Sequence, residues 1–130
     1  MARSAVQVAE QLFKCIENKQ VDGVAALYHD DVEVWHNFDN AIQTKAENLK
    51  VLTGLTQTVA QLRYEILERH TIGNRVVQRH NLYCRMAGND EIVIPACIFL
   101  TVDGEKIKRI DEYLDTAQAS KLRSAGRTAR

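Results

Sequence analysis

The chain of 130 residues has the length of one domain, and its 45% hydrophobic and 26% charged residues are an ordinary globular mixture. Its 17 Lys and Arg residues balance 17 Asp and Glu residues, so the basic stripe of a nucleic-acid-binding surface is not expected. Three cysteines, an odd number without metal-ligand spacing, predict neither a disulfide framework nor a metal site.

The N-terminal half has the pattern of three helices and one short strand. Ser4 can cap a first helix, in which apolar residues recur every three or four positions, and Asp22 can cap a second, shorter one. Residues 32–36 have the β-branched and aromatic content of a strand. Thr44 and Glu47 are spaced as a capping box and predict the start of a third helix.

The C-terminal half changes to the pattern of strands. Four runs, at about residues 63–72, 75–86, 91–102 and 106–114, are divided by short turns that contain glycine. Strands joined by such tight turns pair antiparallel. Residues 116–124 then have the pattern of a final helix.

The order α-α-β-α-β-β-β-β-α predicts an α+β domain over residues 1–124, followed by a basic C-terminal tail at 125–130. We expect a cone-shaped, curved antiparallel sheet wrapped on the three N-terminal helices, with a pocket for a small apolar molecule at its open end. The run at 91–102 is apolar on both faces, which predicts a homodimer through the outer sheet face. The N-terminal stretch of residues 1–20 has no long uncharged apolar run, so neither a membrane partner nor secretion is expected, and we predict a cytoplasmic protein.

The sequence ALYHDDVEVWHNF, the capped helix after it and the hairpin-linked strands ending in DGEKIKRIDEYLD resemble the nuclear transport factor 2-like superfamily. Within it, the likeness is to the SnoaL-like branch and to limonene-1,2-epoxide hydrolases, and it covers about residues 5–120. The resemblance implies the cone fold. The superfamily includes isomerases, epoxide hydrolases, dehydratases, cyclases and proteins without catalytic activity, so the fold alone does not imply one reaction.

The epoxide hydrolases of this superfamily use a Tyr-x-Asn pair, an Arg-x-Asp pair and a second acid on three strands. Trp35 and Asn37 resemble the first pair, Arg79 and Asn81 resemble the second, and Glu112 stands in the place of the second acid. An amide such as that of Asn81 does not titrate, so epoxide opening by two carboxylates is disfavoured.

Two other branches of the superfamily imply catalytic histidines. Counted from the Asp-Asp pair before the first strand, the base of the ketosteroid isomerases falls at His36. His70 resembles the strand histidine of scytalone dehydratase.

The alternation of residues leaves two strand registers open. Periodicity turns His36 inward with Val32 and Val34, whereas the likeness to the epoxide hydrolases turns the Trp-x-Asn pair inward. In the run at 75–86 the more apolar face carries His80, whereas the likeness turns the Arg-x-Asn pair inward.

These residues predict a small-molecule enzyme that uses general acid–base catalysis without a cofactor. We expect an isomerase, dehydratase or cyclase acting on an apolar polyketide-, terpenoid- or steroid-like substrate. Glu112 is the expected acid or base, His70 or His36 its proton partner, and Arg79 and Asn81 the groups that orient water or a substrate oxygen. The expected substrate-binding residues are Trp35, Asn37, Tyr64, His80 and Phe99. A non-catalytic ligand-binding or dimerisation module is the alternative, and an epoxide hydrolase is the second alternative.

Overall fold

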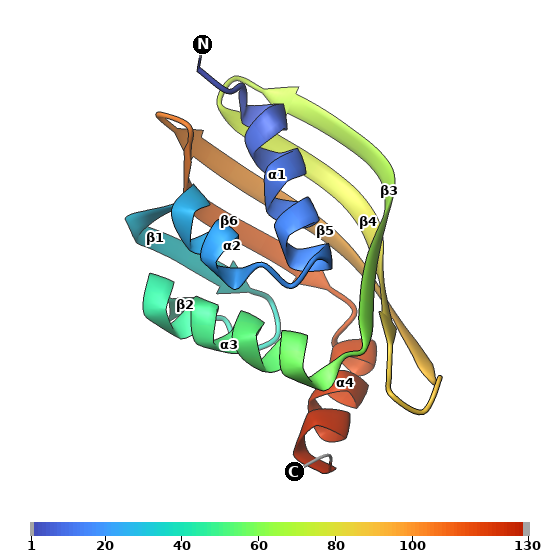
Figure 1. The fold of residues 1–130 in the computed structure, drawn as a ribbon. Helices are drawn as coiled ribbons and strands as arrows, with labels where there is room; N and C mark the ends of the chain where they lie inside the picture. The colour runs from blue at the N-terminus through green and yellow to red at the C-terminus, as the bar shows by residue number, and fades with distance from the viewer. Residues whose placement is uncertain (1, 129–130) are drawn as a thin grey trace.

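The computed structural model describes the backbone of residues 2–128 and the side chains of residues 2–125. Helices precede most of the strands along the chain, as the sequence pattern predicts (Figure 1). The elements are α1 (Ala5–Glu17), α2 (Val21–Leu27), β1 (Tyr28–His36), β2 (Ile42–Gln43), α3 (Lys45–Thr58), β3 (Gln61–Ile72), β4 (Arg75–Arg85), β5 (Glu91–Asp103), β6 (Lys106–Leu114) and α4 (Thr116–Thr128).

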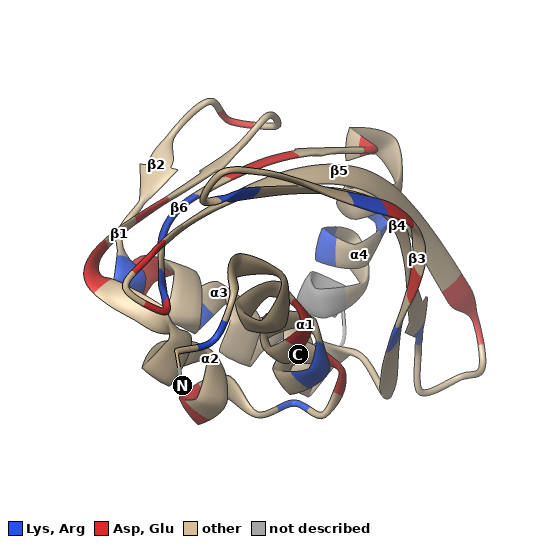
Figure 2. Ribbon diagram, turned by 90° about the horizontal axis from the view of Figure 1, so that it is seen from above, with Lys and Arg blue, Asp and Glu red and all other residues tan. Residues whose placement is uncertain are grey.

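The strands form one curved sheet in the order β2-β1-β6-β5-β4-β3. Seen from above, the sheet arches over α1, α2 and α3, and none of the described helices covers its convex face (Figure 2). The predicted α+β cone is therefore confirmed. The sheet is mixed rather than wholly antiparallel, because β1 runs parallel to β6 while β3, β4, β5 and β6 pair as antiparallel neighbours.

Local capping explains where the helices begin. Ser4 caps α1 and Thr44 forms a capping box with Glu47, both as predicted, and Ser4 completes a capping box with Gln7 as well. The cap predicted at Asp22 is wrong: Gln20 occupies the N-cap of α2 without a side-chain hydrogen bond, and Asp22 lies in the first turn. There its negative charge still stabilises the helix by interacting with the positive, N-terminal end of the helix dipole.

The core lies between the helices and the concave face of the sheet. Its fully buried side chains come from both layers and include Val8, Leu12, Val24, Val76, Cys84, Leu100 and Ile107. Burying one such aliphatic side chain stabilises the fold by about 1.5–3 kcal/mol. Gly23 allows α2 to approach α1 closely, because a Cβ atom there would lie 2.7 Å from Sγ of Cys15.

A β-bulge in β3 reverses which residues face inward. Before it, Leu62 is buried against the helices, and Ile66 pairs with His80. The register then shifts between Ile66 and Glu68, so that Arg69 pairs with Gln78 and His70 pairs with an outward position. One extra residue in a strand exchanges its two faces.

The C-terminal helix extends beyond the predicted domain boundary. α4 ends at Thr128, so residues 125–128, predicted as tail, continue the helix. Residues 129 and 130 of that tail lie outside the described residues, as does the side chain of Arg127.

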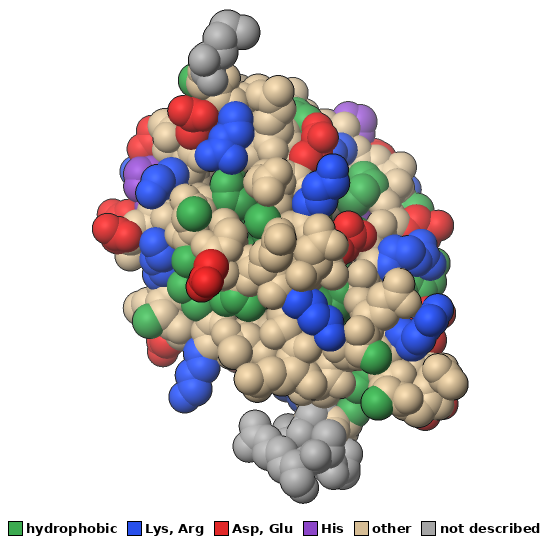
Figure 3. Space-filling model, viewed as in Figure 1, with side chains coloured by type: hydrophobic (Ala, Val, Ile, Leu, Met, Phe, Trp, Pro, Cys, Tyr) green, Lys and Arg blue, Asp and Glu red, His purple; other side chains and the backbone are tan. Residues whose placement is uncertain are grey.

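Charges of both signs are spread over the face that the helices present (Figure 3). No helix in the described part of the chain is long and apolar enough to cross a membrane.

Candidate functional site

A cavity of about 440 Å³ opens between α1, α3, α4 and the concave face of the sheet. This volume is in the range of small-molecule sites. The exposed side chains of Phe38, Val51 and Arg123 lie at its rim, and Arg123 stacks over the Phe38 ring at 5.0 Å. The apolar residues that line its wall include Leu12, Phe13, Ile16, Val34, Leu52, Leu55, Leu82, Ile94, Ile98 and Ile110.

Three ionisable side chains meet in this apolar wall. Nε2 of His36 lies 3.2 Å from Oε1 of Glu112, and Nε2 of His80 lies 4.0 Å from Oε2 of the same carboxylate. The exposed fractions of the side chains are 13% for His36, 20% for Glu112 and 1% for His80. A carboxylate thus stands between two imidazoles where little water reaches.

Strand register explains why these groups converge. His36 at the end of β1 is the parallel partner of Glu112 in β6. Glu112 is in turn the antiparallel partner of Ile98 in β5, and Ile98 is the partner of Gln78 in β4. Partners in register share one face of a sheet, so His36, Glu112 and Gln78 lie in one row across its concave side, with His80 two residues along β4.

Behind His80 a chain of hydrogen bonds leads to the edge of the sheet. Nε2 of Gln78, itself fully buried, is 2.8 Å from Nδ1 of His80. Nε of Arg69 donates to Oε1 of Gln78 at 2.8 Å, and Nη1 of Arg69 is 3.9 Å from a carboxylate oxygen of Glu10. Burial lowers the pKa of His80 below its ordinary value of 6.5; the charge of Glu112 opposes this and that of Arg69 adds to it.

Two tyrosines share the cavity with this cluster. The ring of Tyr64 meets the imidazole of His80 edge-on, with centroids 5.0 Å apart. The Tyr28 hydroxyl donates to Oδ1 of Asn48 at 2.7 Å. Burial, reinforced by the negative charge of Glu112, raises the pKa of both tyrosines well above 10.0, so both hydroxyls stay protonated.

His70, Arg79 and Asn81 are among the predicted catalytic residues, but they do not reach the cavity, and this corrects the prediction. His70 and Arg79 are exposed on the convex face, and each contacts a carboxylate oxygen of Glu68 at 2.8 Å. Asn81 donates to Glu65 there. His70 is displaced by the bulge in β3, and the other two occupy the outward positions of β4.

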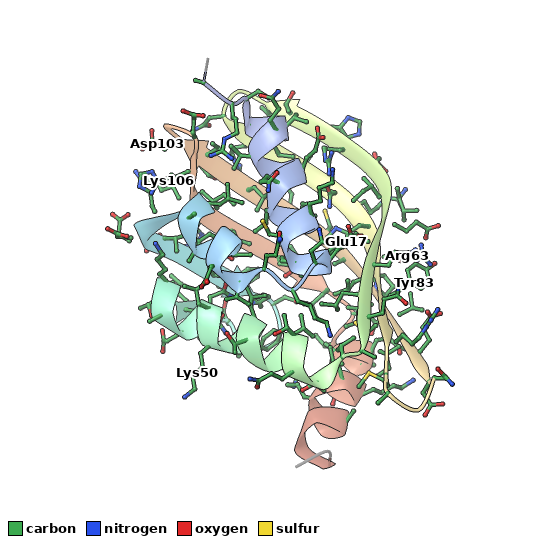
Figure 4. The ribbon with its side chains drawn as sticks, in the orientation of Figure 1. Glu17, Lys50, Arg63, Tyr83, Asp103 and Lys106 are labelled. Atoms are coloured by element: carbon green, nitrogen blue, oxygen red, sulfur yellow. The ribbon has the colours of Figure 1, made fainter. Side chains whose placement is uncertain are left out.

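The convex face beside them carries its own polar contacts. The guanidinium of Arg63 lies 4.0 Å from the ring centroid of Tyr83, whose hydroxyl donates to Glu65. Figure 4 shows Arg63 and Tyr83 projecting from β3 and β4 away from the helices. These contacts support the sheet but do not bear on the cavity.

Trp35, Asn37 and Phe99, predicted to bind substrate, are likewise not among the described residues that line the cavity. Trp35 donates through Nε1 to Asn40 and meets Tyr113 edge-on. Asn37 exchanges hydrogen bonds with the backbone of Leu114 and so ties the ends of β1 and β6 together. Phe99 lies under the guanidinium of Arg75 on the convex face.

Four of the predicted site residues line the cavity: His36, Tyr64, His80 and Glu112. Sequence reasoning did not single out Gln78 or Arg69. The signal for Gln78 was present, because it shares the more apolar face of its strand with His80 and Val76. Within the described residues, no three His, Cys, Asp or Glu side chains are grouped so as to hold a metal ion.

Comparison with solved structures gives the same fold at low sequence identity. A protein from Shewanella denitrificans OS-217 assigned as a SnoaL-like polyketide cyclase superposes with a TM-score of 0.79 at 16% identity, over 93% of this chain and 97% of that one. An epoxide hydrolase of the LEH-like type from M. tuberculosis gives 0.77 at 18% identity, over 96% and 92%.

A protein with a ketosteroid isomerase-like fold from Catenulispora acidiphila DSM 44928, in complex with trimethylamine, gives a TM-score of 0.72 at 13% identity, over 82% of this chain and 84% of that one. No curated protein sequence matches the chain. Residues 9–110 match the family model of the SnoaL-like domain, and the chain therefore belongs to the SnoaL-like domain family.

Proposed function

We propose that the protein is a small-molecule enzyme in which Glu112 moves protons on an apolar substrate, without a cofactor. The observation that carries the proposal is the carboxylate of Glu112 between the imidazoles of His36 and His80, inside a largely apolar cavity. A carboxylate in such a place serves as a general base and, once protonated, as a general acid. The apolar wall supplies binding for a polyketide-, terpenoid- or steroid-like body.

The proposed step balances without a further reactant. Glu112 takes a proton from a C–H group of the substrate, and the electron pair of that bond becomes a new double bond. In an isomerisation the existing double bond shifts and its electron pair takes the proton at another carbon, and in a dehydration the proton goes to the departing hydroxyl group. In a cyclisation the deprotonated carbon, as an enolate, forms a C–C bond with a second carbonyl carbon of the substrate, and the proton goes to the alkoxide oxygen that results. Imidazole groups exchange protons near pH 7, and His36, at 3.2 Å, is the proposed proton partner of Glu112.

Epoxide hydrolysis by a pair of carboxylates is not proposed. Among the described residues that line the cavity, Glu112 is the one carboxylate. The second acid would have to come from the position of Asn81, which is an amide and lies on the convex face.

The proposal is tested by proton exchange at carbon. We would incubate a panel of cyclic and polycyclic ketones with the protein in D₂O and follow loss of C–H signals by NMR; ketones are chosen because the similar Shewanella protein is assigned as a polyketide cyclase. Exchange is expected with the wild-type protein and is expected to slow by about 10²–10⁴-fold in Glu112→Gln. Circular dichroism would show that the variant stays folded.

The charge-matched control is Glu91→Gln, at an exposed position at the start of β5, which should leave exchange unchanged. Equal exchange in Glu112→Gln and the wild-type protein would remove Glu112 from the mechanism. Ketones that bind without any exchange would favour a non-catalytic ligand-binding module, the second candidate, which the largely apolar wall supports.

We also propose a cytoplasmic location. The thiols of Cys15, Cys84 and Cys97 are all free, as is usual in a reducing compartment. Recovery of the protein with an extracellular fraction would contradict this.

A further inference from the structure

The buried amide of Gln78 can take only one orientation. Arg69 is a donor without acceptor capacity, and its Nε lies 2.8 Å from the amide oxygen of Gln78. With the amide reversed, its NH₂ group would face the guanidinium N–H, donor against donor. The oxygen therefore faces Arg69, and the NH₂ group faces His80.

This orientation decides which nitrogen of His80 carries the proton. The NH₂ group of Gln78 can only donate, so Nδ1 of His80, 2.8 Å away, must accept with its lone pair. The proton of the neutral imidazole is then on Nε2, the nitrogen that faces Glu112.

The Nε2–H group is left available to a ligand. It is 4.0 Å from Oε2 of Glu112, beyond direct hydrogen-bonding distance, and it makes no hydrogen bond with any described residue. The groups that face His80 agree with a neutral ring. The Tyr64 hydroxyl is held protonated, and the positive charge of Arg69 and burial both lower the pKa of His80, against the opposing charge of Glu112.

We infer that Arg69 and Gln78 are positioning residues that hold His80 as the neutral Nε2–H tautomer, so that the cavity offers an N–H donor beside the Glu112 carboxylate to an oxygen atom of the substrate. The ligand class is thus an apolar molecule with a carbonyl or hydroxyl oxygen close to the carbon that Glu112 deprotonates. This use of the donor rests on the proposed function, whereas the tautomer itself does not. A preorganised donor of this kind stabilises negative charge that develops on the oxygen.

The test is the protonation state of His80 in the ligand-free protein. Long-range ¹H–¹⁵N spectra of protein labelled with ¹⁵N-histidine distinguish protonated from unprotonated ring nitrogens, and the signals that vanish in His80→Gln assign the residue. We expect Nε2 protonated and Nδ1 unprotonated at pH near 7. An Nδ1–H tautomer or a doubly protonated ring in the wild-type protein would overturn the inference.

Gln78→Glu tests the role of the amide with little change of shape. A carboxylate there can only accept, so His80 should move its proton to Nδ1 or become an imidazolium, and its ¹⁵N signals should shift accordingly. Gln57→Glu, at an exposed position in α3, is the matched control and should leave them unchanged. Unchanged His80 signals in a folded Gln78→Glu protein would also overturn the inference.

Should Gln78→Glu fail to fold, Arg69→Met provides the second variant, because loss of the guanidinium frees the amide to reverse. A mixture of both tautomers is then expected, and a single unchanged Nε2–H tautomer would contradict the role of Arg69. These spectra are independent of the exchange assay. If His80 has the Nε2–H tautomer but Glu112→Gln is fully active, only the proposed function is wrong. If Glu112→Gln is inactive but His80 has another protonation state, only this inference is wrong.

Discussion

His36 has a ring nitrogen whose surroundings restrict its chemistry. Its Nδ1 atom is buried and makes no hydrogen bond with any described residue. A proton on Nδ1 would leave a buried donor unpaired, at a cost of about 1–3 kcal/mol, and would turn the bare Nε2 lone pair toward the carboxylate of Glu112. A neutral His36 is therefore more stable with its proton on Nε2, which lies 3.2 Å from Oε1 of Glu112.

Burial of His80 makes stability depend on pH. Its folded pKa lies below 6.5, chiefly because of burial, whereas in the unfolded chain histidine titrates near 6.5. Between these values the unfolded state binds more protons, so this contribution is present in full above about pH 6.5 and is lost as the pH falls toward the folded pKa.

We expect His80→Gln, which cannot titrate, to lose less stability than the wild-type protein when the pH falls below about 6.5. Urea unfolding at a series of pH values measures both free energies of unfolding. Parallel curves for the two proteins would show that His80 is not held neutral by the fold.

At the scale of elements, the contact between α1 and α2 depends on Gly23. A Cβ atom there would lie 2.7 Å from Sγ of the buried Cys15, whereas a Cβ atom at Gly54 in α3 would meet no atom of the described residues within 4 Å. Overpacking costs about 1–3 kcal/mol. Alanine in place of glycine inside an unobstructed helix gains up to about 1 kcal/mol.

Gly54→Ala should therefore raise the free energy of unfolding, and Gly23→Ala should be the less stable of the two variants by at least about 1 kcal/mol. Thermal or urea unfolding of both variants tests the pair. An equal gain in both would mean that α1 and α2 are not packed as closely as described.

The faces of the strands show which of the inward residues could be predicted from the sequence. Alternation correctly predicted that His36 and His80 face inward, because each shares its face with apolar residues that the core buries. His70, which the likeness to scytalone dehydratase implied as a catalytic residue, faces outward instead, because the bulge between Ile66 and Glu68 shifts the alternation of β3 by one residue and no turn residue marks that bulge. The likeness to the epoxide hydrolases turned the Trp-x-Asn pair of β1 and the Arg-x-Asn pair of β4 inward. In each strand the side chain that lines the cavity is instead the residue between the two, His36 or His80.

Long-range pairing was also beyond the sequence pattern. The parallel contact of β1 with β6 joins segments about 75 residues apart, and it brings His36 to Glu112. Local periodicity reports only which face a residue shares with its neighbours. The buried link from Arg69 through Gln78 to His80 depends on the same kind of distant register and was not predicted.

At the scale of the whole molecule, none of the described helices lies over the convex face of the sheet, and the outward row of β5 on this face is largely apolar. The half-buried side chains of Val93, Cys97 and Phe99 lie there on β5. We propose that a second copy of the chain covers this face, as the apolar outer pattern of β5 predicts.

Light scattering should then give twice the monomer mass of 14.7 kDa. Val93→Asp should shift the protein toward the monomer, because it would bury an unpaired charge in the interface. Gln57→Asp, at an exposed position in α3 on the opposite side of the sheet, should leave the dimer intact. A wild-type protein that is monomeric at micromolar concentration would rule out the proposed dimer.

The proposed mechanism requires that a substrate bind within the cavity with its reacting carbon at Glu112. The most direct measurement is a crystal structure of Glu112→Gln with a ketone that the wild-type protein exchanges. We predict the ketone oxygen within hydrogen-bonding distance of Nε2 of His80 and an acidic C–H directed at the side chain of residue 112. A ketone bound elsewhere, or bound in the cavity with its reactive carbon turned away from residue 112, would contradict the account.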